Sequence, residues 1–469
     1  MTPQKAHFIG IAGMGMSAVA ILLKEQGWHV TGSDTEAYPP ATTQLAAHEI
    51  PFNTTYSAAN ISKDADVVII GKNAKVTREN PEVAAAYDSG IRIASFPEIL
   101  GELVAKRSPI VVAGSYGKST TTSLIAWLLS QSGVDAGWFI GAAPHAMEPG
   151  HLGTHNAFVL EGDEYPTSHD DSRAKFAHYR AHDALITAAS HDHVNIYKTQ
   201  EEFLKPFEEL VSSLPDNGIL MLCTDEPYAA TLAKHSKARV VTYGIADPLT
   251  DWHATSIRAG ETTTFDLVHK QKKIATLETS LIGEHNVQNI VGAAALLIEK
   301  KLLTPEQIAK ALKEFKGLAR RLDKKTFLSH VPAYEGFGSS REKLQAAIQA
   351  MKQVYPEERL IVVFEPHTFS WRNKNMLHWF DTAFMGANIV LLYKPAEQGA
   401  DTHEQSSQED MAARLSAAHI PVLSATTPKD VLDILGLEIR PGDVILLSSS
   451  GPMDGLIERI PAWLDSTFS

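Results

Sequence analysis

The feature of this sequence that most constrains its fold is the alternation of short apolar runs, rich in β-branched residues, with helical patterns. The runs are bounded by turn residues and read HFIGIAG, DVVIIG, IVVAG, AFVLEGDE, DALITAAS, RLIVVFEP, NIVLLY and DVILLSSSG. Such alternation predicts an α/β protein with mostly parallel sheets that helices cover on both faces. Several runs end in polar residues, and ligands of open α/β sheets bind at the carboxyl ends of strands. Function is therefore expected in the loops that follow these strands.

The chain is long enough for several domains. A length of 469 residues indicates roughly three, at about 150 residues each. The segment before Ser108 already completes a small α/β unit, and a second boundary is expected near Arg321. The predicted domains are residues 1–107, 108–321 and 322–469.

Composition excludes some classes of function. The net charge of −13 and the isoelectric point near 5.8 argue against a protein that coats nucleic acid or an anionic membrane, because no basic surplus is available. The one cysteine, Cys223, excludes internal disulfides and is expected to be a buried, inert thiol. The N-terminal stretch lacks a signal-peptide pattern, and no run approaches the roughly 18 apolar residues of a membrane span. We expect a soluble cytoplasmic protein, and no obligate protein partner is evident.

A first glycine loop lies near the N-terminus, in HFIGIAGMGMSAVAILLKEQGWHVTGSD. Gly10, Ala12 and Gly15 fit the pattern G-x-[GA]-x-x-G, with Gly13 as an additional glycine. Small residues there let backbone amides approach a diphosphate at the N-terminus of the following helix. Asp34 follows the second strand, where a carboxylate can accept hydrogen bonds from a ribose or a base. The spacing predicts a diphosphate site but does not separate NAD from UDP.

A second loop, VVAGSYGKSTTTS at residues 111–123, resembles a phosphate-binding loop. The usual pattern G-x-x-x-x-G-K-[ST] has glycine where this chain has Val112. The surrounding pattern still predicts a strand, a tight turn that contains two glycines, and a helix. Lys118 would then lie beside unpaired amides and reach the terminal phosphates of a nucleotide, with the Ser119 hydroxyl placed to bind Mg²⁺. We refer to residues 111–123 as the lysine loop.

Candidate metal ligands follow two further predicted strands. They are Glu161, Asp163 and Glu164 in VLEGDEYP, and His191, Asp192 and His193 in LITAASHDHVNIY. Oxygen ligands with an imidazole suit Mg²⁺ or Mn²⁺ that also holds substrate phosphates. Together with the two loops, these ligands indicate an enzyme that joins or activates a substrate.

Eight motifs stand in order along nearly the whole chain: HFIGIAGMGMS, GSD, AGSYGKSTTT, EGDEY, DHVNIY, GEHNVQN, FKGLARRLD and FEPH. Together they resemble the Mur ligase family, the ATP-dependent amide ligases of peptidoglycan metabolism. The resemblance implies an N-terminal Rossmann-like domain for the UDP-sugar, a central P-loop ATPase domain with a mostly parallel sheet, and a C-terminal Rossmann-like domain. It also implies that ATP phosphorylates the lactoyl carboxylate of UDP-N-acetylmuramate, giving an acyl phosphate that the incoming amine attacks.

The resemblance further implies roles for individual residues. The implied catalytic residues are Lys118, Glu164 and His193, and the implied metal ligands are Ser119, Glu164 and His193. The implied ATP contacts are Gly114, Ser115, Tyr116, Gly117, Lys118, Ser119, Thr120, His285, Asn286, Asn289, Arg320 and Arg321. The implied substrate contacts are Gly10, Ala12, Gly13, Met14, Gly15, Ser17 and Asp34 for the UDP-sugar, and His367 and Arg372 for the acceptor.

Finer features separate two branches of the family. YPP after GSD, the stretch IIGKNAKVTRENPEVAAA, ASFPEIL and the tyrosine of EGDEY resemble the branch that attaches recycled L-Ala-γ-D-Glu-meso-diaminopimelate to UDP-N-acetylmuramate. The alternative is the branch that adds L-alanine to the same sugar nucleotide.

The sequence departs from the family pattern at three places. GSYGKST replaces the usual G-T-H-G-K-T-T, ITAASH replaces an asparagine-and-glutamate stretch, and the turn at residues 338–341 replaces His-His-Pro. The altered turn motivates a further hypothesis, a nucleotide-binding sensor without catalysis. An NAD-dependent oxidoreductase would use the first glycine loop but would leave the lysine loop unexplained.

Overall fold

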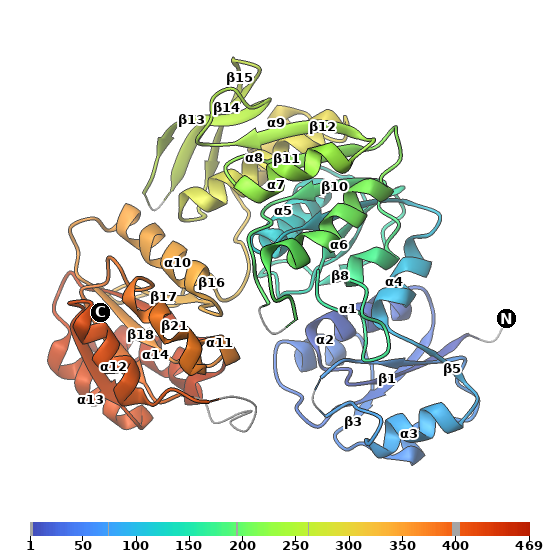
Figure 1. Cartoon of the computed structure of the whole chain (residues 1–469), viewed down its shortest axis with the longest axis horizontal. Coiled ribbons are helices and arrows are strands. Elements are labelled where there is room, and N and C mark those ends of the chain that lie inside the picture. Colours follow the sequence, from blue (N-terminus) through green and yellow to red (C-terminus); the bar gives the residue numbers. More distant parts are fainter. Residues whose placement is uncertain (1–2, 74, 194–195, 261, 396–403) are drawn as a thin grey trace. The chain divides into compact units, whose positions relative to one another are not determined.

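The chain folds into two compact units that hold three sheets (Figure 1). The computed structural model describes residues 3–73, 75–193, 196–260, 262–395 and 404–469. The first unit comprises Met1–Ile257, Thr264–Thr279 and Asn286–Gly317, and the second comprises Arg258–Thr263, Ser280–His285 and Leu318–Ser469. The predicted α/β class with mostly parallel sheets is confirmed.

The first sheet belongs to the first unit and consists of parallel strands in the order β3-β2-β1-β4-β5. Its strands are β1 (Lys5–Ile9), β2 (His29–Ser33), β3 (Phe52–Asn53), β4 (Val67–Ile70) and β5 (Arg92–Ala94). The helices along it are α1 (Met14–Glu25), α2 (Ala41–Ala47), α3 (Pro81–Asp88) and α4 (Phe96–Val104). Because the strand order reverses at β1, the loop between β1 and α1 lies where ligands of such sheets bind.

Helix α1 follows the first glycine loop. The side chains from Met16 to Leu23 are all buried, so its apolar sequence packs against the sheet and its neighbouring helices. The helix ends at Glu25, and the amide of Gly27, whose φ is +91°, donates to the Lys24 carbonyl at 2.9 Å. The predicted strand, loop and helix, with Gly27 ending the helix, are therefore confirmed.

The second sheet has the strand order β15-β14-β13-β12-β11-β10-β6-β9-β7-β8. Its strands are β6 (Ser108–Ala113), β7 (Gly137–Phe139), β8 (Gly150–His151), β9 (Ala157–Gly162), β10 (Asp183–Ile186), β11 (Ile219–Cys223), β12 (Arg239–Gly244), β13 (Trp252–Arg258), β14 (Thr263–His269) and β15 (Lys272–Thr279). The helices between and after these strands are α5 (Lys118–Gln131), α6 (Gln200–Ser213), α7 (Pro227–Thr231), α8 (Glu284–Glu299) and α9 (Pro305–Leu312). The central strands β9, β6, β10 and β11 pair in parallel, so their carboxyl ends share one edge.

The third sheet belongs to the second unit and has the order β16-β17-β21-β18-β19-β20, in which β16 is antiparallel to β17 and the other pairs are parallel. Its strands are β16 (Arg321–Lys324), β17 (Ala333–Gly336), β18 (Leu360–Phe364), β19 (Ile389–Tyr393), β20 (Val422–Ala425) and β21 (Val444–Ser448). Its helices are α10 (Arg341–Val354), α11 (Phe369–Arg372), α12 (Gln408–Ala417), α13 (Pro428–Glu438) and α14 (Leu456–Thr467). The predicted boundary before Ser108 falls between α4 and β6, and the one after Arg321 falls inside β16; both stay predictions.

The lone cysteine lies in the core of the first unit, at the end of β11. Its side chain is fully buried, and burial, together with the nearby Asp225 carboxylate, raises the pKa of the Cys223 thiol to about 12. The predicted burial of the thiol is confirmed. The raised pKa supports the predicted inertness, because the reactive thiolate is scarce at neutral pH.

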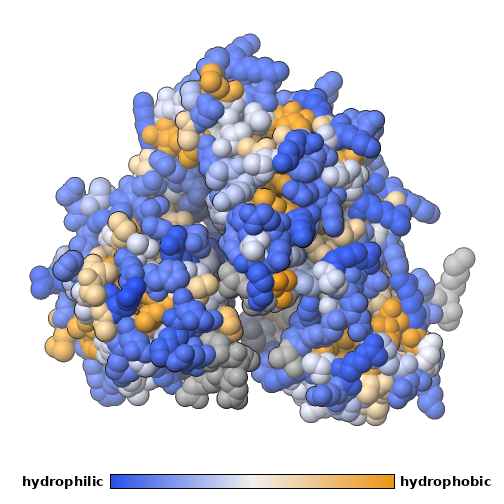
Figure 2. Space-filling model, viewed as in Figure 1, coloured by the Kyte–Doolittle hydropathy of each residue, from blue (hydrophilic) through white to orange (hydrophobic). Residues whose placement is uncertain are grey.

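The surface is mostly hydrophilic on the face that Figure 2 shows, where apolar residues form scattered patches. Within the part of the chain that the structure describes, no helix has the length and apolar character needed to cross a membrane.

Candidate active site

Three neighbouring strands bring predicted catalytic residues to one edge of the second sheet. Strand β6 pairs with β9 on one side and β10 on the other, and its Ala113 is level with Gly162 and Ile186. The chain leaves all three strands at this edge. The lysine loop, the acidic run after β9 and the segment after β10 therefore converge.

Lys118 is the first residue of α5, and its ammonium lies inside this convergence. Gly117, with φ of +83°, caps the helix, so the chain turns sharply into α5. The Lys118 Nζ atom donates to the Gly114 carbonyl at 3.0 Å and lies 3.2 Å from Glu164 Oε2. The fold thus holds a largely buried ammonium group beside a helix N-terminus, an arrangement suited to an anion.

Three carboxylates control the charge state of this lysine. Burial alone would lower the pKa of Lys118, but Glu164, Asp163 and Glu161 outweigh burial and raise the pKa above its usual range. Lys118 therefore stays charged at any physiological pH. Burial raises the pKa of Glu161, against the opposing effects of the Ser119 hydroxyl and Lys118, whereas Lys175 and Lys118 overcome burial and lower the pKa of Asp163.

Ser119 contacts a different carboxylate from the one expected to share its metal. Its hydroxyl donates to Glu161 Oε1 at 2.7 Å, and the Gly141 amide donates to Glu161 Oε2 at 2.7 Å. Glu164 instead meets Lys118 and His193. Glu161, already a candidate metal ligand from the sequence, is therefore the carboxylate that Ser119 contacts.

His193 completes the group around Glu164. Its Nε2 atom lies 3.1 Å from Glu164 Oε1, and its ring packs edge-on against Tyr165 at 5.1 Å between centroids. Its amide donates to the Asp192 carboxylate at 2.7 Å. His191 does not join this group, because its Nε2 atom lies 2.9 Å from the Tyr197 carbonyl oxygen. Residues 194 and 195 of DHVNIY lie outside the described residues.

Three residues that were not predicted from the sequence form hydrogen bonds around Tyr116 of the lysine loop: Thr187, Ser190 and Glu226. Thr187, directly after β10, donates its hydroxyl to the Tyr116 carbonyl. The Tyr116 hydroxyl and the Ser190 hydroxyl both donate to Glu226 Oε1. Their place after strand ends was the available signal, but their contacts join residues 36, 71 and 110 positions apart.

Asn289 is brought to the lysine loop from helix α8. A Cβ atom at Gly117 would lie 2.7 Å from Asn289 Oδ1, so the start of α8 lies against the loop. Asn286, one turn earlier on α8, is also buried. Ser115 is buried within the loop itself, and Thr120 lies in the first turn of α5.

The first glycine loop is held by its own hydrogen bonds. Asp34 accepts from the Ala12 amide at 3.0 Å, and the Gly10 amide donates to the Ser33 carbonyl at 2.8 Å. The Ser17 hydroxyl donates to the carbonyl of Met14, the first residue of α1, at 3.1 Å, and Gly13 caps this helix. Asp34 therefore fixes the loop itself, in addition to its predicted role toward a ligand.

Packing accounts for the glycine at position 15. A Cβ atom on Gly15 would lie 3.1 Å from the Phe96 ring, which is tighter than ordinary contact. A larger side chain would have to displace Phe96 of α4.

Three predicted site residues of the second unit lie near the end of β21. Arg320 donates to Glu335 Oε1 at 2.7 Å and to the Gly451 carbonyl at 2.8 Å. His367 lies against Gly451 and the Ser450 hydroxyl, and burial with the charges of Arg372 and Arg320 lowers the pKa of His367. Arg320, His367 and Arg372 thus lie close enough to interact. Arg320 and Arg321 both lie over the Phe337 ring, at 5.0 and 5.1 Å from its centroid, and Arg321 also lowers the pKa of His285.

His285 provides a test of the electrostatics of the second unit. Burial, with a contribution from Arg321, lowers the pKa of this ring from 6.5 to about 4. The unfolded chain binds the proton near pH 6.5 and the folded chain near pH 4, so stability falls as pH decreases across this window. Above pH 6.5 the ring is neutral in both states and adds nothing to the pH dependence of stability. Between pH 7 and pH 4, the free energy of unfolding should fall by about 1–3 kcal/mol more in the wild type than in His285→Asn, as measured by thermal melts. NMR titration of a wild-type ring near pH 6.5 would contradict this.

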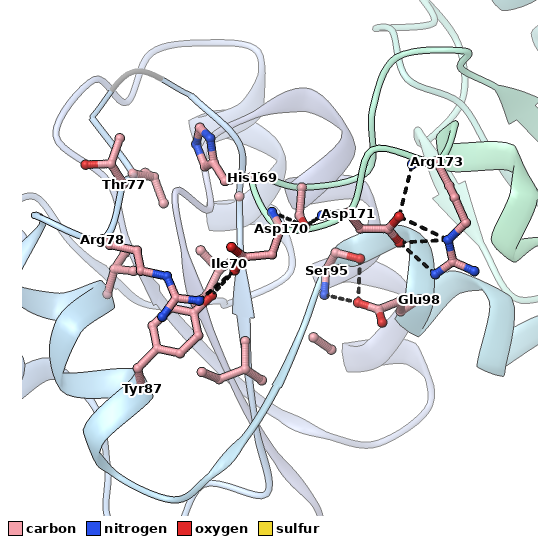
Figure 3. A pocket seen from close by; sticks show the side chains of 16 residues that line it. Ile70, Thr77, Arg78, Tyr87, Ser95, Glu98, His169, Asp170, Asp171 and Arg173 are labelled. Carbon is pink, nitrogen blue, oxygen red and sulfur yellow. Dashed lines mark hydrogen bonds and ion pairs between the residues drawn. The ribbon is translucent and has the colours of Figure 1, made fainter.

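A cavity of about 440 Å³ lies in the first unit, between the ends of β4 and β5 and the segment 168–173 (Figure 3). Four of its charged side chains form two ion pairs, Arg78 with Asp170 and Arg173 with Asp171, and Glu98 accepts from Ser95. Tyr87 also donates to Asp170, at 2.7 Å. None of the predicted site residues lines this cavity.

Comparisons with known proteins find one enzyme family in both sequence and fold. Residues 112–297 match the Mur ligase middle domain, and residues 5–108 match the catalytic domain of the Mur ligase family. A UDP-N-acetylmuramate–L-alanine ligase of Geobacter sp. (strain M21) is 31% identical over 96% of this chain and 95% of its own length. The UDP-N-acetylmuramate–L-alanyl-γ-D-glutamyl-meso-2,6-diaminoheptandioate ligase of Haemophilus influenzae is 28% identical over 97% of this chain and 98% of its own. A crystal structure of a murein peptide ligase from Psychrobacter arcticus 273-4 shares the fold, with a TM-score of 0.73, 24% identity, and coverage of 99% of this chain and 100% of that one.

A lysine at a helix N-terminus on a mostly parallel sheet, beside buried carboxylates, is typical of ATP-dependent enzymes of the α/β class. The chain belongs to the Mur ligase family, whose members are ATP-dependent amide ligases.

Family enzymes generally use Mg²⁺ with ATP, and the residues present fit such an ion. The Ser119 hydroxyl and the carboxylates of Glu161 and Glu164 are oxygen donors of the kind Mg²⁺ and Mn²⁺ prefer, and His193 adds an imidazole. Among the described residues, no three His, Cys, Asp or Glu side chains form a ready metal cluster.

Proposed function

We propose that this protein joins UDP-N-acetylmuramate to the tripeptide L-Ala-γ-D-Glu-meso-diaminopimelate, using ATP. The observation that carries the proposal is the Lys118 ammonium, held by the Gly114 carbonyl and Glu164 beside His193. The tripeptide is supported by the relative named for that ligation in Haemophilus influenzae and by the EGDEY and IIGKNAKVTRENPEV motifs.

The proposed chemistry has two steps. The sugar's lactoyl carboxylate attacks the γ-phosphorus of ATP, ADP leaves, and an acyl phosphate forms. The amine of the acceptor then attacks the acyl carbon, phosphate leaves, and the amide results. Lys118 neutralises charge on the transferring phosphoryl group, and Glu164 and His193 would hold the metal. Mg²⁺, when bound, would offset the negative charge of the phosphate groups.

The second candidate is a UDP-N-acetylmuramate–L-alanine ligase. It is favoured by the names of the relatives, because more of them carry this name than the tripeptide name. The two candidates share the first substrate and differ in the amine.

An assay of ADP release with a panel of amines tests the proposal. With UDP-N-acetylmuramate, ATP and Mg²⁺ present, we expect the tripeptide to support turnover at least about tenfold better in kcat/KM than L-alanine. The reverse preference would establish the second candidate. Nucleotide binding without ADP release for any amine would favour a sensor, and tight NADH binding without UDP-sugar binding would favour an oxidoreductase.

A further inference from the structure

Two lysine side chains lie near the ring of Tyr165, beside the group formed by Lys118, Glu164 and His193. The Lys72 Nζ atom lies 5.5 Å from the ring centroid, and the Lys175 Nζ atom lies 5.9 Å from it. The same ring packs edge-on against His193, which contacts Glu164. Tyr165 therefore connects two lysines with the residues proposed to carry out the reaction.

Both lysines also border the first glycine loop. Lys72 follows Gly71, where a Cβ atom would lie 3.7 Å from the Gly10 carbonyl oxygen. Lys175 lies 5.4 Å from the centroid of Phe96, the ring that packs on Gly15. Both lysines thus come close to residues that contact the loop proposed for the sugar nucleotide, and both reach Tyr165, next to Glu164, all within the first unit.

The two lysines differ in their partners. Lys175 forms an ion pair with Asp163 at 2.5 Å. Lys72 makes one long hydrogen bond, 3.5 Å to the Pro166 carbonyl, and has no carboxylate partner among the residues that the structure describes. Burial and the charge of Lys175 both lower the pKa of Lys72, and Asp163 opposes them. An incoming anion beside Lys72 would therefore offset the repulsion that this lysine meets from Lys175.

We propose that Lys72, supported by Lys175, forms a carboxylate-binding subsite that positions the lactoyl group of the sugar acid for phosphorylation. This inference rests on the proposed function and deepens it by assigning a residue to the acid group of the first substrate. Backbone amides at the start of α1 are available for the diphosphate, whereas the lysines lie on the side of Tyr165 and His193, where the reacting carboxylate has to be. Lys72 is thus a positioning residue for the attacking group.

Calorimetric binding of two sugar nucleotides to the full-length Lys72→Met variant tests this subsite. UDP-N-acetylmuramate carries the carboxylate, and UDP-N-acetylglucosamine lacks the lactoyl group but keeps the diphosphate. We expect the variant to bind the first about tenfold more weakly and the second within about twofold of wild type, since one charge-assisted hydrogen bond is lost. Lys72→Arg should recover part of the affinity for UDP-N-acetylmuramate.

A matched control is Lys75→Met. Lys75 lies on the same segment, but its side chain is more than half exposed and pairs with Glu36. This variant should bind both sugar nucleotides as wild type does, and thermal melts should show that both Met variants are folded. In turnover assays, only Lys72→Met should raise the KM for UDP-N-acetylmuramate, with the KM for ATP unchanged.

The outcomes separate the subsite from the function. Equal weakening of both sugar nucleotides would place Lys72 at the diphosphate and overturn the subsite, and so would unchanged affinity for both. Wild-type protein that binds ATP but neither sugar nucleotide would overturn the proposed function and the subsite together. If Lys72→Met turns over as the wild type does and still prefers UDP-N-acetylmuramate to UDP-N-acetylglucosamine to the same degree, the subsite alone is overturned.

Discussion

Replacing Lys118 with methionine is expected to lower ATP-dependent amide formation by about 10³-fold or more. The ammonium is the cation held directly between the lysine loop and Glu164, and a preorganised charge aimed at a transferring phosphoryl group is among the largest single contributions to catalysis. ADP release with saturating UDP-N-acetylmuramate and acceptor measures the effect. ATP affinity, measured by calorimetry, should fall with it.

The change also leaves the Glu164 side chain, which is completely buried, without its lysine partner, although the contact with His193 remains. Some loss of stability is therefore expected, and activity has to be compared at a temperature where thermal melts show a folded variant. Binding of UDP-N-acetylmuramate, which relies on the first sheet, should persist. Lys106→Met, at an exposed lysine before β6, is the matched control and should be fully active. Turnover by Lys118→Met within tenfold of wild type would remove the basis of the proposed function.

The second large effect is expected from Gly114→Ala. The backbone of Gly114 has φ of +149°, and a Cβ atom there would lie 2.2 Å from Thr187 Oγ1 and 2.8 Å from the Ala188 amide nitrogen. Thr187 cannot move freely, because its hydroxyl also holds the Tyr116 carbonyl. The loop must therefore shift away from β10, which would carry the Gly114 carbonyl away from Lys118. We expect ATP affinity to fall by about 100-fold or more and stability by about 2–4 kcal/mol.

The variant Gly133→Ala is the control for Gly114→Ala, because it tests backbone strain without steric conflict. Gly133 also has positive φ, +80°, but no atom lies within 4 Å of its Cβ position. This variant should lose only about 1–2 kcal/mol and bind ATP normally. Equal effects of the two substitutions on ATP binding would show that close packing against β10 is not what shapes the loop.

The parts of the fold that the sequence predicted well are those with local signals. Strands β6, β9 and β10 are buried on both faces, so their runs are almost continuously apolar and stand out in the sequence. The lysine loop was predictable because glycines, a lysine and a helix follow one another within a few residues. Parallel pairing then brings the strand ends together, which is why the sequence alone is enough to group Lys118, Glu164 and His193.

The choice of partner within that group could not be predicted, because it depends on register and on side-chain direction. Ser119 donates to Glu161, 42 residues away, since Glu161 lies on β9 itself while Glu164 lies beyond the strand. Phe96 packs on Gly15 across 81 positions, and Tyr116 reaches Glu226 across 110. No local pattern carries such information. The same holds for Lys72, whose surroundings come from β4 and from the segment after β9.

The buried state of Cys223 makes the chain a favourable starting point for site-specific labelling. With no second cysteine in the sequence and a thiol whose pKa is about 12, maleimide reagents at neutral pH should leave wild-type protein unmodified. Cysteines introduced at exposed positions, for example at Lys106 in the first unit and Leu437 in the second, would then carry a fluorophore pair without any background substitution. Energy transfer between the dyes would follow, in real time, how the separation of the two units responds to nucleotide and sugar acid.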